Sequence, residues 1–147
     1  MNDSGDLRQT LKDVFAAQRF CVLATQGEGQ PYGSLVAFAE TGDLKQLVFA
    51  THRDSRKFSN LTSDPRVALV IDSRSNNDLD FSNAVAITAL GTAHEAAGGE
   101  REHLAGVYLA KHPSLVGFIG SPEVAVCSVE VAEYFVSGFS DVTRLQA

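Results

Sequence analysis

The residues best suited to chemistry in this chain lie in residues 47–69, where an apolar strand runs into a short helix. The segment reads LVFATHRDSRKFSNLTSDPRVAL, and it places Arg56 and Lys57 in the first turn of a helix that we expect to begin at Asp54 or Ser55. The first turn is the positive end of the helix dipole, so two cations there repel it unless an anion lies beside them. The pattern therefore predicts an anion site, and a phosphate group is an anion that helix N-termini bind readily.

A solvated basic surface is the alternative interpretation of the same segment. Arg53 adds a third cation, and Asp54 would neutralise part of the charge on such a surface. Small clusters of cations are common on protein surfaces, so the charges alone do not separate the two interpretations. The motifs that flank the segment favour the phosphate site.

The other reactive residue types indicate neither a metal site nor a nucleophile. No two of the four histidines have the tight spacing of zinc ligands, so we expect surface positions for them: His52, His94, His103 and His112. Cys21 and Cys127 lie inside the apolar runs FCVLAT and VAVCSV, which favours buried strand positions over a disulfide or a metal pair. Tyr32 and Tyr134 are expected as half-buried tyrosines of the sheet rather than as proton donors.

The composition is typical of a small globular protein. The chain has 147 residues, of which 44% are hydrophobic, so we expect one domain over residues 1–147. Its formal net charge of -6 argues against an extended nucleic-acid surface, because such a surface must be basic. The N-terminal MNDSGDLRQT has no basic start, and no segment approaches about 18 continuous apolar residues. We therefore expect a protein of the cytoplasm that neither binds nor crosses a membrane.

The hydrophobic pattern predicts a chain that is mainly β with flanking helices. Apolar residues recur at helical spacing over residues 7–15 and 100–109, and a further helical turn is expected at 114–119. The polar stretch Ser73 to Asn83 is expected to be a mobile loop that flanks a site. Antiparallel strands joined by short turns favour a small closed barrel, because closure removes exposed edges. We expect strands at residues 20–25, 33–39, 47–51, 66–71 and 85–95, with one or two more within 124–136.

Three stretches in this order carry a resemblance to a known family: PYGSLVAF, LVFATHRDSRKFSNLTSDPRVALVI and ALGTAHEA. The match spans roughly Cys21 to Glu95, and SVEVAEYFVSGF continues it more weakly. Together the stretches resemble the pyridoxamine 5'-phosphate oxidase-like superfamily of FMN-binding split barrels. The resemblance implies a homodimeric, six-stranded split β-barrel of antiparallel strands, with FMN held in each of two clefts between the subunits.

The resemblance also implies roles for individual residues. Arg56 and Lys57 would hold the flavin phosphate, and the strand that contains Val36 would line the isoalloxazine ring with its backbone. Asn60, one turn beyond Lys57, would brace the phosphate loop or a neighbouring subunit. The full set of implied cofactor-binding residues is Ser34, Leu35, Val36, Phe49, Ala50, Thr51, Ser55, Arg56, Lys57, Asn60 and Phe135.

Several positions depart from the pyridoxamine phosphate oxidases proper. Ser34 replaces an Arg, Ala86 replaces a Gln, and the tail keeps only Arg144 of a C-terminal segment rich in Arg and His. Phe135 replaces a ring-contacting Trp, which preserves an aromatic wall without its hydrogen bond. Pyridoxamine phosphate itself is therefore not the expected substrate.

The C-terminal third has a second resemblance within the same superfamily. The run from Lys111 through HPSLVGF to YFVSGFSDV resembles the haem-utilisation branch, although that branch's haem-contacting tail is not evident. His112, which precedes Pro113, is the candidate haem contact in this interpretation.

These features predict an FMN-dependent oxidoreductase that uses a reduced nicotinamide or a similar donor on an unidentified small-molecule substrate. No catalytic side chain is assigned, because FMN supplies the hydride and electron chemistry and the protein need only position it. Two alternatives remain: a flavin-binding or electron-carrier protein without turnover, and a relative that handles F420 or haem.

Overall fold

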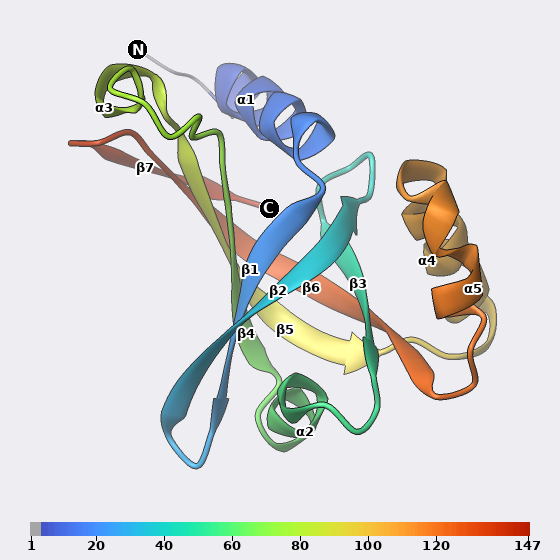
Figure 1. The fold of residues 1–147 in the computed structure, drawn as a ribbon. Coiled ribbons are helices and arrows are strands. Elements are labelled where there is room, and N and C mark those ends of the chain that lie inside the picture. The colour runs from blue at the N-terminus through green and yellow to red at the C-terminus, as the bar shows by residue number, and fades with distance from the viewer. Residues whose placement is uncertain (1–3) are drawn as a thin grey trace.

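The computed structural model describes residues 4–147, and its strands form one antiparallel sheet that closes into a barrel (Figure 1). The strand order is β3-β2-β1-β4-β5-β6-β7, and a pairing between β3 and β6 closes a barrel of six strands. This confirms the predicted split barrel. The strands are β1 (Phe20–Gly27), β2 (Gln30–Glu40), β3 (Gln46–His52), β4 (Arg66–Asp72), β5 (Ala86–Glu95), β6 (Val124–Ser137) and β7 (Val142–Gln146).

Helices lie around the barrel, with α2 near the tip of the β1–β2 hairpin and α1 toward the opposite end (Figure 1). All the predicted helical segments are confirmed, with ends that differ by a few residues. Within residues 4–147, no helix combines the length and the apolar character that crossing a bilayer requires. The helices are α1 (Ser4–Ala17), α2 (Arg56–Ser63), α3 (Asp80–Asn83), α4 (Gly98–Lys111), the 3-10 turn η1 (Pro113–Leu115) and α5 (Val116–Ile119).

The main core fills the barrel interior. Strand β1 alternates, so that Cys21 and Leu23 point inward while Phe20 and Val22 point outward. The apolar face of α1 extends this core, since Phe15 packs edge-on against the ring of Phe38 at 5.7 Å between centroids. Alternation of this kind is what the period-two pattern predicts for strands with one buried face.

Strand β3 is buried on both faces, which explains its unbroken apolar sequence. Phe49 points into the barrel, whereas Val48 and Ala50 pack against Leu104 and Tyr108 of α4 on the outside. Helix α4 therefore covers the outer surface of β3 and its neighbours, β2 and β6, as Figure 1 shows.

Away from α4, the barrel's outer surface carries a mostly apolar row. Cross-strand pairing places Leu35, Val22, Val70, Thr88 and Phe135 side by side from β2 to β6. We call these five residues the outer row. Leu35 is 67% exposed and Val22 37%, which is unusual for apolar residues on neighbouring strands.

Two segments differ from the sequence-based prediction. The expected loop Ser73 to Asn83 contains α3, because the Asp80 carboxylate accepts the amide protons of Ser75 and Asn76 at 2.7–3.1 Å and so closes a turn. Its mobility stays a prediction. Of the one or two strands expected within residues 124–136, the structure has one, β6, and the tail adds the unpredicted strand β7.

Two polar side chains are more deeply buried than predicted. His112 is buried rather than on the surface, and its Nε2 lies 2.7 Å from the carbonyl oxygen of Phe38. Tyr134 is fully buried rather than half-buried, and its hydroxyl donates to the carbonyl oxygen of Leu44 at 2.7 Å. Both groups replace their hydrogen bonds to water with bonds to backbone carbonyls, which permits the burial. Cys21 and Cys127 are free and buried, as predicted.

Candidate functional site

The turn between β3 and α2 is organised by two hydroxyl groups. Ser55 caps α2: its Oγ accepts the amide proton of Phe58 at 3.3 Å and its hydroxyl donates to the carbonyl oxygen of His52 at 2.8 Å. Thr51 Oγ1 lies 2.9 Å from Ser55 Oγ. Of the two predicted helix starts, Asp54 and Ser55, the structure has Ser55 as the cap, and Thr51 is fixed beside it.

The first turn of α2 is an unusually positive helix start. Arg56 and Lys57 are its first two residues, and no acidic residue lies in that turn. Because the amides of Phe58 and Ser59 are bonded to Ser55, those of Arg56 and Lys57 are the first-turn donors without an acceptor inside the helix. Two amides, two cations and the dipole thus favour an anion at this end.

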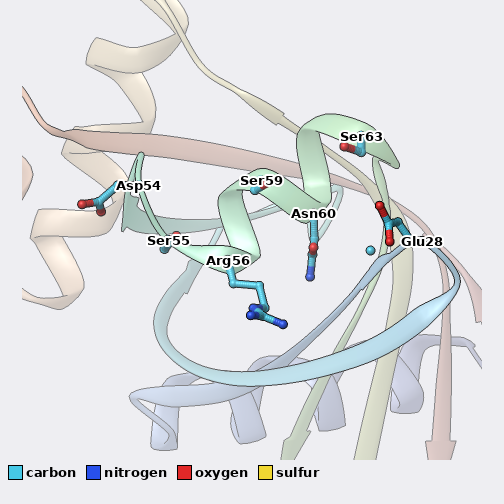
Figure 2. Close-up of a pocket in the computed structure, with 8 residues that line it drawn as sticks. Glu28, Asp54, Ser55, Arg56, Ser59, Asn60 and Ser63 are labelled. Carbon is cyan, nitrogen blue, oxygen red and sulfur yellow. The ribbon is translucent and has the colours of Figure 1, made fainter.

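The two cations point into different cavities. Lys57 lines a cavity of about 310 Å3 on the side of α4, whereas Arg56 lines one of about 570 Å3 between α2 and the β1–β2 hairpin. Figure 2 shows the Arg56 side chain extending from α2 toward the hairpin, where its guanidinium carbon lies 5.6 Å from the ring centre of Tyr32. Arg56 and Lys57 are therefore neighbours in the sequence that line different cavities, which the sequence alone did not indicate.

The cavity at Lys57, which we call the apolar cavity, collects five of the predicted site residues from three elements. Leu35 and Val36 come from β2, Ala50 and Thr51 from β3, and Lys57 from α2. Its opposite wall is formed by α4 and the segment that follows it. Nothing in the sequence indicated that these elements face β2 and β3. The residues not predicted for this cavity are Phe20, Ala37, His52, Tyr108, Leu115 and Phe118.

The cavity at Arg56, which we call the polar cavity, is lined mainly by hydroxyl and charged side chains (Figure 2). Asn60 lies at its wall, and its Nδ2 donates to Thr25 Oγ1 at 3.1 Å, which ties α2 to β1. A Cβ on Gly27 would come within 2.4 Å of Asn60 Oδ1, so only glycine allows this approach. Asn60 therefore braces the helix that carries the cations. The cavity is lined by Gly27, Glu28, Asp54, Ser55, Arg56, Ser59, Asn60 and Ser63.

Three predicted site residues lie outside both cavities. The side chain of Phe49 is fully buried in the barrel, and its backbone pairs with the neighbouring strands β2 and β6. The Ser34 hydroxyl donates to the carbonyl oxygen of Leu23 at 3.4 Å. Phe135 lies at the far end of the outer row, where the Arg144 guanidinium carbon is 5.2 Å from its ring centre. Their predicted roles toward a cofactor stay predictions.

The buried thiols near the site are chemically quiet. Burial raises the pKa of the Cys21 thiol to about 12 and that of Cys127 to about 12, so both stay protonated at neutral pH. Burial likewise raises the pKa of the Tyr108 hydroxyl, at the wall of the apolar cavity, to about 12. Among residues 4–147, no three His, Cys, Asp or Glu side chains are grouped as metal ligands would be.

Solved structures show the same fold. The heme binding protein from Mycobacterium smegmatis superposes with a TM-score of 0.79 at 21% identity, over 90% of this chain and 55% of that one. This chain thus spans about half the length of that protein. A Clostridium acetobutylicum protein related to general stress protein 26, of the pyridoxinephosphate oxidase family, gives 0.75 at 14%, over 99% and 96%. An FAD-binding protein from Mesorhizobium loti gives 0.66 at 18%, over 88% and 90%.

Sequence comparison identifies the family. No curated protein matches the sequence significantly. The family model described as pyridoxamine 5'-phosphate oxidase matches residues 7–136, from the first helix to the closing strand of the barrel. This match covers most of the chain and agrees with the barrel topology described above. The chain therefore belongs to the pyridoxamine 5'-phosphate oxidase family.

Proposed function

We propose that this protein binds FMN in the apolar cavity and acts as an FMN-dependent oxidoreductase on a small organic substrate. One observation carries the proposal: Lys57, at the positive end of α2, and Thr51 line a cavity whose other lining residues are mainly apolar. A cofactor with a phosphate at one end and a flat aromatic ring at the other requires this division of polarity.

The donor set at the phosphate end fits a phosphate dianion. Lys57 supplies a charge, and the two first-turn amides supply directed hydrogen bonds. The Ser55 hydroxyl already donates to the carbonyl oxygen of His52, which leaves its oxygen to accept the Thr51 proton. Turning the Thr51 hydroxyl toward the cavity would exchange that bond for one to the anion.

The ring end is built to hold a flat group and to limit the access of water. Leu35 and Val36 present the β2 backbone on one side, and Leu115 and Phe118 close the other. The Phe118 ring is held edge-on to the His52 ring, at 5.5 Å between centroids. When bound, FMN supplies hydride and single-electron transfer, so the residues of the cavity need only bind it and shape access to it.

We also propose that a second copy of the chain completes the site. The apolar cavity, at about 310 Å3, lies at the lower end of the roughly 300–1,000 Å3 typical of small-molecule sites. Leu35 belongs both to this cavity and to the exposed outer row, so a subunit packed on that row would also cover the cavity. Such a homodimer would bury Phe135 in the same interface. Size-exclusion chromatography with light scattering tests this, and a strict monomer would refute it.

The first experiment identifies the cofactor. Mass spectrometry of the ligand released by denaturation distinguishes FMN from F420 and from haem, and we expect FMN. Added FMN should raise the melting temperature of the stripped protein, because a ligand that binds the native state stabilises it. A colourless protein whose melting temperature no flavin raises would refute the proposal.

A flavin-binding protein without turnover is the second candidate, favoured by the small set of titratable residues at the apolar cavity, namely His52, Lys57 and Tyr108. Stopped-flow mixing of the FMN-loaded protein with NADH and NADPH, followed by a panel of acceptors, separates the two candidates. Flavin bleaching by a nicotinamide and reoxidation by an acceptor support the enzyme, and their absence supports the carrier. Haem is less favoured, because the Nε2 of His112 is already committed to the carbonyl oxygen of Phe38.

A further inference from the structure

The apolar cavity continues into a second cavity along β2. This neighbour, of about 460 Å3, shares Phe20, Ala37 and Leu115 with it, so the two form one groove. Lys57 lies at one end of the groove and Arg19 at the other. We call the second part the arginine cavity. It is lined by Arg19, Phe20, Ala37, Lys111, His112, Pro113, Ser114 and Leu115.

Two of the polar groups in the arginine cavity are already bonded. The Lys111 ammonium donates to the carbonyl oxygen of Phe15 at 2.7 Å and to Glu40 Oε1 at 2.9 Å, and it lies 3.8 Å from the ring centre of Phe38. The Glu40 carboxylate balances its charge. The Nε2 of His112 faces a carbonyl oxygen, which only accepts, so Nε2 carries a proton and donates it to that oxygen. Both side chains are therefore already engaged by protein oxygens.

Arg19 differs from the other arginines. Its backbone carbonyl accepts the amide proton of Phe38 at 3.1 Å, which fixes the residue at the start of β1. Arg56 stacks on Tyr32, and the remaining arginines donate to protein oxygens. Arg19 is exposed, and within the part of the chain that the structure describes its guanidinium has no such protein partner. The arginines bonded to protein oxygens are Arg8, Arg53, Arg66, Arg74, Arg101 and Arg144.

We propose that the arginine cavity binds the carboxylate of the substrate, which is then a small organic acid. A planar guanidinium with free donors binds a carboxylate through two parallel hydrogen bonds, and one uncompensated cation matches one negative charge. With its carboxylate on Arg19, such a molecule would lay its apolar part against Phe20 and Leu115, the walls shared with the apolar cavity. This inference rests on the proposed function, since it places the substrate beside the ring that the apolar cavity would hold.

Benzoate and its neutral isostere benzamide are suitable probes, because they differ in charge and hardly in shape. Each is titrated into the FMN-loaded protein and followed by calorimetry and by the change in flavin absorbance. We expect the parent to bind benzoate at least about tenfold more tightly than benzamide, the size of a charge-assisted bond. Equal binding of the two probes would overturn the proposal.

Arg19→Gln removes the charge and keeps a polar, though shorter, side chain. We expect it to weaken benzoate binding by about 10- to 100-fold and to leave FMN affinity unchanged. Arg8→Gln is the matched control, since Arg8 is a surface arginine outside the groove, bonded to the carbonyl oxygen of Gln146. If Arg19→Gln binds benzoate as tightly as Arg8→Gln, the anion lies elsewhere and the proposal is overturned.

The same titration on the flavin-free protein separates this proposal from the proposed function. If no flavin binds, the proposed function fails, but the loss of benzoate affinity in Arg19→Gln would still support the anion site. If flavin binds and Arg19→Gln retains the parental benzoate affinity, the anion site fails alone. Arg19→Lys keeps the charge but lacks the planar guanidinium. Its affinity for benzoate should therefore lie between that of the parent and that of Arg19→Gln.

Discussion

The two cations of α2 should contribute unequally to flavin binding, although they are neighbours in the sequence. Lys57 lines the cavity that we assign to FMN, whereas Arg56 lines the other cavity and contacts the ring of Tyr32. Lys57→Ala removes a direct charge-assisted contact, worth about 1.5–3 kcal/mol, and should weaken FMN by about 10- to 150-fold. Arg56→Ala removes a charge that acts across water, worth about 1 kcal/mol or less, and should weaken FMN at most about fivefold.

Fluorescence titration of FMN against the stripped variants measures these affinities. The double variant should lose about the product of the two effects, roughly 10- to 750-fold at low salt, and the effect should shrink as salt screens the charge. Lys45→Ala is the control, since Lys45 is an exposed lysine of the β2–β3 turn outside all the cavities of the site. A larger loss for Arg56→Ala than for Lys57→Ala would refute the assignment of the cavities, and a double variant with parental affinity would place the phosphate elsewhere.

The flavin-free protein offers an independent check on the electrostatics. Lys57→Ala relieves the repulsion between a cation and the positive end of α2, so it should leave the melting temperature unchanged or raise it. Arg56→Ala relieves the same repulsion but also loses the contact with Tyr32, so its effects should nearly cancel. A marked destabilisation by Lys57→Ala would show that the lysine has a structural partner in solution.

Three further predictions concern stability. Lys111→Met leaves the half-buried Glu40 carboxylate without its cation, and urea denaturation should show a loss of about 2–4 kcal/mol, whereas an unchanged midpoint would contradict the ion pair. Gly91→Ala would bring a Cβ within 2.2 Å of the carbonyl oxygen of Glu130, at the bulge between β5 and β6, and should lower the free energy of unfolding by about 2 kcal/mol or more. Bonds from Arg66 lower the pKa of Asp64 from 3.8 to about 2, so this carboxylate stabilises the fold above about pH 4 and loses that effect as the pH falls toward 2. Asp64→Asn should therefore flatten the acid limb of a melting-temperature profile, and an unaltered limb would count against this linkage.

Local patterns account for most of the agreement between sequence and structure. The hydrophobic runs predicted strands at residues 20–25 and 47–51, and the structure has β1 and β3 there. The start of α2 was predicted at Asp54 or Ser55, because a capping side chain next to the helix is a local signal, and Ser55 is the cap. The residues Leu35, Ala50 and Lys57 followed from a family pattern, and the barrel brings them to one cavity.

The parts that sequence reasoning missed depend on long-range packing. Arg56 and Lys57 are about 100° apart around a helix, so adjacency could not show that a strand hairpin faces one and α4 the other. Phe118 belongs to a predicted helical turn, but only the packing of α4 and α5 on the barrel turns it toward His52. His112 is buried because the carbonyl oxygen of Phe38, distant in sequence, accepts its proton.

Strand β6 has consequences for how the protein should be produced. Its first half pairs with β3 over residues 124–130, and its second half pairs with β7 over residues 133–137. A chain shortened before Val142 would expose the backbone donors and acceptors of the second half as an open edge, and open edges recruit strands from other molecules. Purification tags on the C-terminal side should therefore follow a flexible linker after Ala147, and truncated versions should aggregate during expression.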